Sequence, residues 1–162
     1  MQFEKATTQH GTPLYVFPMP GIMSVAVGVL VYAGTRDEKW PQEAGLAHAC
    51  EHMVFQGNAR LGSSQAISGE IESDGGVLNA FTASEMTFFH RFVPANAFET
   101  AVRSLASQMA SPLFRPEDIT KEMQNVVEEI KRKQDNPAAL CHSIFAGVVY
   151  GDHPLGRETL GS

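Results

Sequence analysis

The chain has 162 residues, a net charge of −6 and a hydrophobic fraction of 43%, with 14 Gly and 9 Pro. This composition is typical of a single globular domain over residues 1–162 and argues against disordered or collagen-like chains. Because 12 basic residues face 18 acidic ones, we expect no nucleic-acid partner.

Three further features bear on membranes and on the cell compartment. The longest apolar stretch, residues 23–33, is about half of what a membrane-spanning helix needs, so we expect no membrane segment. The N-terminus lacks the basic and apolar segments of a secretory signal. Cys50 and Cys141 are too few for a disulfide framework. These features predict a cytoplasmic protein, an expectation that a lost leader would change.

The first half of the chain alternates between strand and helix signals. Runs rich in Val and aromatic residues predict two antiparallel neighbouring strands at 14–20 and 24–34. Apolar residues at helical spacing then predict a mostly buried helix that starts at Leu46 and ends at Gly57. Residues 63–76 begin with Ser and end with two Gly, which is typical of a short capped helix.

A predicted hairpin and three helices follow. The hairpin joins strands at 77–82 and 86–93. The first helix should bury a stripe made of Phe98, Val102, Leu105 and Met109. The second starts near Pro116, runs for ~18 residues and ends before Pro137, and the third covers residues 138 to about 149 before a final loop. This order of elements predicts an α+β fold, an antiparallel sheet with helices packed on one face.

A pair of histidines suggests a metal site. His48 and His52 are four residues apart on the predicted helix, so their imidazoles project from one face and can reach a common point. Two imidazoles, one carboxylate and a position for water form the ligand set of a catalytic zinc site. The order from His48 to His52 is H-x-x-E-H, the inverzincin motif. Glu51 lies ~100° around the helix from His52, so we predict that it is the general base and not a ligand.

A pair of histidines alone is more often part of an ordinary core or surface. Glu51 changes this balance, because a carboxylate on an apolar helix costs several kcal/mol unless it is paired or coordinated. The third ligand should be a carboxylate on an element packed beside the histidine helix. The candidates share the helix after Pro116: Glu117, Asp118, Glu122, Glu128 and Glu129.

Spacing favours two of these carboxylates. Glu122 and Glu129 are seven residues apart and lie within ~20° of each other on one helix face, whereas Glu128 points elsewhere. One of the two could bind metal while the other orients a ligand. A solvated acidic face explains the same spacing equally well.

The residues around the histidines carry a family resemblance. The segment GLAHACEHMVFQGN is similar to the zinc motif of the M16 peptidases, the group of pitrilysin, insulin-degrading enzyme and mitochondrial processing peptidase. Glu129 lies seventy-seven residues after His52, as the third zinc ligand does in that family, and Glu122 matches its supporting carboxylate. GGVLNAFTASEMTFFHRFV resembles the family's strand beside the active site, and HPLGR at 153–157 resembles a loop that follows the ligand helices. The resemblance covers nearly all of residues 13–162.

The resemblance implies a LuxS/MPP-like metallohydrolase lobe with one Zn²⁺. It implies that His48, His52 and Glu129 bind the metal, with Glu122 in support and Glu51 as catalytic base. Asn79 and Ala80 would bind an extended peptide substrate by adding it to the strand as a β-augmentation partner. The implied activity is that of a zinc metalloendopeptidase.

The resemblance also implies a second homologous lobe, which in the family contributes an Arg/Tyr pair to the substrate. We therefore expect this N-terminal lobe to be incomplete at its C-terminus and weak or inactive alone. The strand Val77–Thr82 should lie at a sheet edge near the metal with its outer backbone groups unpaired. An exposed edge carrying Val77, Leu78 and Phe81 predicts self-association.

Two other functions and two side chains complete the expectations. A non-catalytic partner subunit would typically lose metal or base residues, and a structural zinc module would fill all four positions, usually with Cys. Both fit less well, because the ligands and Glu51 are present and the cysteines are not at ligand spacing. Cys50 should simply pack. Phe81 suits a substrate side-chain pocket and the core equally.

Overall fold

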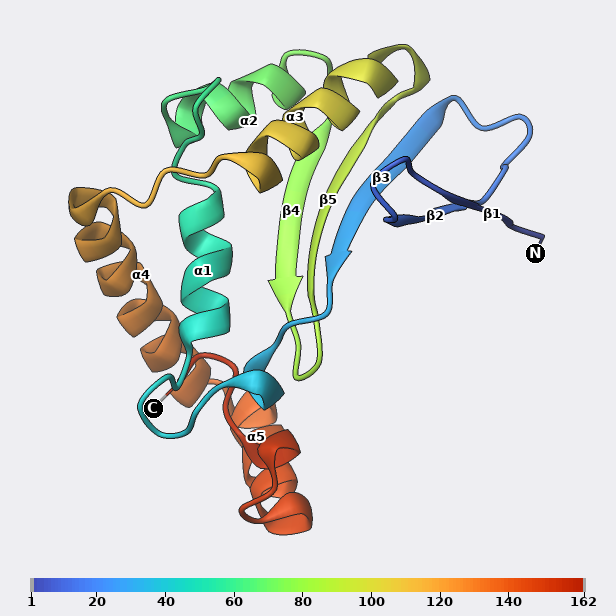
Figure 1. The fold of residues 1–162 in the computed structure, drawn as a ribbon. Coiled ribbons are helices and arrows are strands. Elements are labelled where there is room, and N and C mark those ends of the chain that lie inside the picture. The colour runs from blue at the N-terminus through green and yellow to red at the C-terminus, as the bar shows by residue number, and fades with distance from the viewer. Residues whose placement is uncertain (1, 162) are drawn as a thin grey trace.

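A computed structural model describes residues 2–161 (Figure 1). Its two-stranded sheet pairs β1 with β2, and its three-stranded antiparallel sheet has the order β3-β5-β4. The strands are β1 (Glu4–Thr7), β2 (Pro13–Val16), β3 (Ser24–Val31), β4 (Val77–Thr82) and β5 (Thr87–Pro94). The α-helices are α1 (Leu46–Val54), α2 (Ser64–Glu72), α3 (Phe98–Ala110), α4 (Pro116–Gln134) and α5 (Pro137–Tyr150).

The helices form a layer on the three-stranded sheet. α3 contacts β3 and β5, while α1 and α2 contact β4. α4 packs against α1, outside this layer, and α5 follows α4 and projects away from the sheet (Figure 1). The predicted α+β fold with helices on one sheet face is therefore confirmed.

The predicted pairing of the first two strands is wrong. β2 pairs with β1, a strand that the sequence analysis did not predict, and β3 pairs with β5. Pro18 and Pro20 lack backbone N–H groups, so the segment after β2 is poorly suited to continue a ladder. Gly11, at a φ of 85°, instead allows the tight turn that returns β2 onto β1.

The predicted hairpin is confirmed. β4 and β5 are antiparallel, with Val77 opposite Phe92 and Thr82 opposite Thr87. β5 lies at the centre of the sheet, and β4 forms one edge, as expected. Side chains alternate along β4, so Val77 and Phe81 are exposed while Leu78 is partly buried and packs on the core.

The later helices match their predicted bounds closely. Pro116 is in the first turn of α4, and α4 ends before Pro137. The Asn136 side chain accepts hydrogen bonds from the N–H groups of Ala138 and Ala139, which begins α5. None of the helices in residues 2–161 combines the length and apolar character required to cross a bilayer.

The apolar stripe predicted for α3 is only partly right. Leu105 is buried and Met109 packs against the same cluster, but Phe98 and Val102 are exposed. The buried face instead includes Ala101, Ser104 and Gln108. Small side chains let the helix approach its neighbours closely, and the Gln108 carboxamide has polar partners inside. The stripe predicted from the large apolar residues is therefore displaced by about one residue from the face of α3 that is buried.

α1 is anchored at its C-terminal end. Val54 joins Phe89 and Leu105 in a buried cluster between helix and sheet, and Met53 is also buried. The helix is less buried than predicted, since Leu46 is half exposed, and it ends at Val54 before Gly57. The buried end fixes the helix that carries the histidines.

A buried polar network reinforces this anchor. Arg91 on β5 is fully buried and donates a hydrogen bond to Gln108 Oε1. Gln108 Nε2 in turn donates to the carbonyl oxygen of Val54 at 3.1 Å. Burial lowers the pKa of Arg91 to about 10, because desolvation disfavours the charged guanidinium. The network thus connects β5, α3 and the last residue of α1.

Gln108→Leu is expected to destabilise the fold by about 2 to 4 kcal/mol. It removes a partner of a buried guanidinium and leaves the Val54 carbonyl without its hydrogen bond. Chemical denaturation of both variants measures the effect, with Gln124→Leu on the exposed face of α4 as the control. Equal stability of the two variants would contradict a stabilising role for the network.

Candidate metal centre

Two helices bring the three predicted metal ligands together. α1 places His48 and His52 one turn apart, and α4 packs beside α1 and supplies Glu129. The two Nε2 atoms are 3.2 Å apart. Glu129 Oε2 lies 3.5 Å from His48 Nε2 and 3.6 Å from His52 Nε2. The structure therefore has the convergence of side chains that the sequence predicted.

The triangle of donor atoms fits a zinc ion. Tetrahedral zinc with ligand distances of about 2.0 to 2.1 Å has ligand atoms about 3.3 to 3.4 Å apart. The three separations here bracket that value. The ligand set, two imidazoles and one carboxylate, is also that of catalytic zinc. His48, His52 and Glu129 could therefore hold the metal and leave a fourth position for another group.

Glu122 positions His52 from the side away from the other ligands. Its carboxylate is buried, and Oε2 lies 3.1 Å from His52 Nδ1. Asn125 Nδ2 donates to the other carboxylate oxygen at 3.1 Å. A proton on His52 Nδ1 that is shared with Glu122 leaves the Nε2 lone pair directed toward His48 and Glu129. Glu122 thus contacts the histidine that it was expected to support.

The surroundings of His48 favour the neutral imidazole. Burial lowers the pKa of His48, because desolvation disfavours the charged imidazolium. A lowered pKa means that the ring stays unprotonated at neutral pH, so a lone pair is available for a metal. His48 Nδ1 is buried and has no hydrogen-bond partner within residues 2–161.

Glu128 and Glu129 point in different directions. The Glu128 side chain is mostly exposed, and its carboxylate accepts a hydrogen bond from Lys131 Nζ at 2.7 Å, which lowers its pKa. Glu129 faces the histidines. Of the acidic residues of α4, Glu122 and Glu129 therefore lie against the histidines, whereas Glu128 pairs with Lys131.

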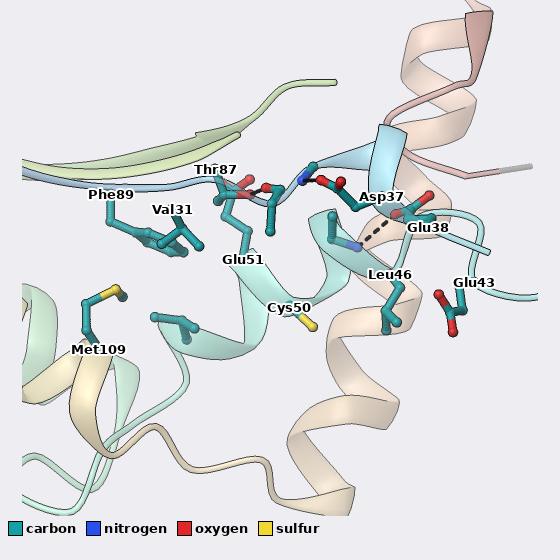
Figure 2. Close-up of a pocket in the computed structure, with 14 residues that line it drawn as sticks. Val31, Asp37, Glu38, Glu43, Leu46, Cys50, Glu51, Thr87, Phe89 and Met109 are labelled. Carbon is teal, nitrogen blue, oxygen red and sulfur yellow. Dashed lines mark hydrogen bonds between the residues drawn. The ribbon is translucent and has the colours of Figure 1, made fainter. Parts of the chain in front are cut away.

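Glu51 lies beside the triangle without belonging to it. Its Oε2 atom accepts a hydrogen bond of 2.6 Å from Thr82 Oγ1. In Figure 2 it points from α1 toward the sheet, near Thr87. Glu51 also lines a cavity of about 450 Å³ together with His52, Asn79 and Glu122. A carboxylate at this position can exchange a proton with a molecule held in that cavity.

A second, apolar cavity lies on the sheet side of α1. It has a volume of about 380 Å³ and is bounded in part by Leu46, Cys50, Phe89 and Met109 (Figure 2). Cys50 is a free thiol and is exposed, so the simple packing expected for it is not found. Desolvation by neighbouring atoms, together with the nearby Glu38 carboxylate, raises the pKa of the Cys50 thiol, which keeps it protonated at neutral pH.

The predicted substrate residues lie on the edge strand β4. Asn79 is exposed, whereas Ala80 packs on the core cluster below the sheet. Asn79 Oδ1 accepts a hydrogen bond from the Ala80 N–H at 2.9 Å. The expectation that all backbone groups on the outer edge of β4 are unpaired is therefore not met at Ala80. Phe81 is exposed and lies with its ring centroid 5.7 Å from that of Phe88. Phe81 is therefore a surface aromatic and not a core residue.

Comparison with known proteins agrees with this geometry. The profile of the family described as Insulinase (Peptidase family M16) matches residues 19–162. The chain belongs to the M16 peptidase family. The matched range includes both helices of the donor triangle and the edge strand.

Curated relatives of this M16 chain are considerably longer. An uncharacterized zinc protease of Rickettsia bellii is 34% identical over 160 residues, which is 99% of this chain and 38% of the relative. The uncharacterized zinc protease YmxG of Bacillus subtilis is 33% identical over 159 residues, with 98% and 38% covered. The M16 chain thus spans well under half of the length of these relatives.

Solved structures share the fold. A protease from Helicobacter pylori superposes with a TM-score of 0.91 at 23% identity, over 99% of this chain and 39% of that one. A peptidase M16 inactive domain from Pseudomonas fluorescens superposes with a TM-score of 0.85 at 16% identity, with the same coverage. Because one of these is an inactive domain, the fold does not decide activity, and the side chains must do so.

Glu38 supports the site and was not identified from the sequence. Glu38 is buried ahead of α1, and its carboxylate accepts hydrogen bonds from the N–H groups of Gly45 and Ala47 at 3.2 and 2.9 Å (Figure 2). A negative charge there complements the positive end of the helix. Arg157, from the segment HPLGR, donates to the Glu38 carbonyl at 2.8 Å. Glu38 acts from outside the first turn, so no capping pattern in the sequence identifies it.

Proposed function

We propose that residues 1–162 form the N-terminal zinc-binding lobe of a metalloendopeptidase that hydrolyses extended peptides or unfolded protein segments. The observation that carries the proposal is the triangle of donor atoms from His48, His52 and Glu129, with Glu51 beside it. Membership of the M16 family supports the same interpretation. One Zn²⁺ per lobe is the proposed cofactor.

The proposed roles follow from the positions of the side chains. His48, His52 and Glu129 would hold the zinc ion, which would supply Lewis acidity toward a water molecule and the scissile carbonyl. Glu51 is outside the ligand set, so its carboxylate would take the proton of the attacking water and return it to the leaving amine. Glu122 holds His52 in the orientation that metal binding requires.

Strand β4 is the proposed substrate platform. It is an edge strand that contacts α1, so a peptide paired with it would pass close to Glu51. Asn79 and Ala80 are the proposed contacts. A peptide that pairs with Ala80 would need the Ala80 N–H, which now donates to the Asn79 side chain. The substrate would therefore displace the Asn79 carboxamide from this hydrogen bond, or the carboxamide would itself bind the substrate.

The whole protein is proposed to contain or recruit a second homologous lobe. The curated relatives are more than twice as long as this chain, which leaves room for such a lobe. Apolar side chains exposed on α5 and β4 support contacts with further protein, or self-association when these residues are expressed alone. They include Val77, Phe81, Leu140, Ile144, Phe145 and Val148. We also propose a cytoplasmic location.

A non-catalytic partner subunit is the alternative function. The inactive M16 domain among the similar structures shows that this fold occurs without activity. Such a subunit has no need for a buried carboxylate that contacts His52 or for a second carboxylate in the cavity that His52 lines. The retention of Glu122 and Glu51 in these positions favours the catalytic lobe.

A chelator assay on the full-length protein tests the proposal. Cleavage of an unstructured peptide should be lost in the presence of a zinc chelator and restored by added Zn²⁺, because the proposed mechanism depends on the Lewis acidity of the metal. Elemental analysis before and after chelation provides the control for metal content. Unchanged cleavage by the zinc-free protein would refute a zinc-dependent mechanism.

A further inference from the structure

The hydroxyl group of Thr82 connects the edge strand to Glu51. Thr82 is the last residue of β4, and its Oγ1 atom lies 2.6 Å from Glu51 Oε2. Both side chains are partly buried. This contact therefore joins the proposed substrate strand to the proposed general base.

The hydrogen atoms of the neighbouring hydroxyls fix the direction of this bond. Thr87 Oγ1 donates its single hydrogen to the carbonyl oxygen of Ala33 at 3.0 Å. Thr82 Oγ1 is 3.4 Å from Thr87 Oγ1 but only 2.6 Å from Glu51 Oε2. A short bond to a carboxylate is stronger than a long bond to a hydroxyl, so the Thr82 hydrogen is donated to Glu51.

The bond leaves the carboxylate half restrained. Oε2 is held by Thr82, whereas no hydrogen bond from another side chain or backbone group of residues 2–161 is found to Oε1, which can therefore accept a proton. Fixing one oxygen limits rotation of the Glu51 side chain and directs the other oxygen. Because proton transfer requires a close approach of donor and acceptor, such restraint affects the rate more than binding.

We infer that Thr82 is a positioning residue for Glu51, which it holds in register with a peptide paired to β4. The inference rests on the proposed function, since it assigns Glu51 the role of general base. It adds that strand and base move as one unit. A substrate that pairs with the strand is then placed relative to Glu51 by the same element that fixes the Glu51 carboxylate.

Two substitutions at Thr82 in the full-length enzyme test the inference. Thr82→Val keeps the shape of the side chain but removes the hydroxyl, and kcat should fall by roughly 10- to 100-fold. KM for an unstructured peptide should change by less than about threefold, and zinc content should stay unchanged, because neither depends on the Glu51 orientation. Thr82→Ser keeps the hydroxyl and should restore most of kcat.

A crystal structure of the Thr82→Val enzyme gives a readout that does not depend on activity. We expect the Glu51 carboxylate to leave its position while His48, His52 and Glu129 keep theirs. Unchanged kcat in Thr82→Val, with Glu51→Gln inactive, would overturn the inference and leave the proposed function intact. Failure of Thr82→Ser to restore kcat, or loss of zinc in Thr82→Val, would also overturn it by showing a purely structural role. An active Glu51→Gln enzyme would instead refute the proposed role of Glu51 as general base, on which the inference rests.

Discussion

Glu51→Gln is expected to lower kcat for peptide cleavage by about 10²- to 10⁴-fold in the full-length enzyme while zinc remains bound. The amide has nearly the same shape as the carboxylate but cannot accept the proton of the attacking water. The oxygen of the introduced amide could still accept the hydrogen bond from Thr82, so the side chain should keep its place. Zinc binding should persist because Glu51 is outside the group His48, His52 and Glu129.

Steady-state kinetics and elemental analysis of the same preparation separate these two effects. Glu99→Gln, the same substitution at an exposed position of α3, is the matched control and should retain full activity. Turnover close to that of the unmodified enzyme, with zinc bound, would remove Glu51 from the role of base. Loss of zinc together with activity would show that Glu51 contributes to metal binding.

The parts of the fold that were predictable from the sequence depend on local signals. Pro116 and Pro137 bound α4, and glycine and serine caps bound α2, because these residues act within one turn of their own position. The β4–β5 hairpin is likewise local. Pairing of β2 with β1 rather than with β3 was not predictable in this way. Both β1 and β3 are possible partners for β2 by strand propensity, and only the three-dimensional arrangement selects between them.

The same distinction applies to the metal centre. The histidines were predictable because residues four apart on a helix share a face, and the pair Glu122 and Glu129 because residues seven apart do so too. Glu38 and Thr82 act on α1 from a loop and from a strand end, and no fixed spacing relates them to the residues that they contact. Supporting residues of this kind emerge only when the fold is known.

The buried face of α3 shows why a clear pattern can still mislead. Phe98 and Val102 fit an apolar helical stripe yet are exposed, while Ser104 and Gln108 are buried. Gln108 is tolerated inside because Arg91 and the Val54 carbonyl satisfy its carboxamide. Burial of a polar side chain depends on such partners, which come from distant parts of the chain.

The ligand assignment predicts opposite results for two neighbouring residues of α4. Glu129→Gln should weaken zinc binding by more than the roughly 10- to 100-fold that loss of an orienting partner costs, because a direct ligand and its negative charge are lost. Glu128→Gln should leave zinc affinity unchanged, because that carboxylate is exposed and pairs with Lys131. The two variants differ in sequence position by one residue and carry the same chemical change.

Competition with a chromogenic chelator measures both affinities, and thermal unfolding with and without zinc provides an independent check. A ligand that binds only the folded state stabilises it by about 2.7 kcal/mol at a concentration one hundred times Kd. Zinc should therefore raise the unfolding temperature of the Glu128→Gln protein but have much less effect on Glu129→Gln at the same concentration. Equal responses would mean that the carboxylate 3.5 Å from His48 Nε2 is not a ligand, and the catalytic assignment of the whole triangle would lose its basis.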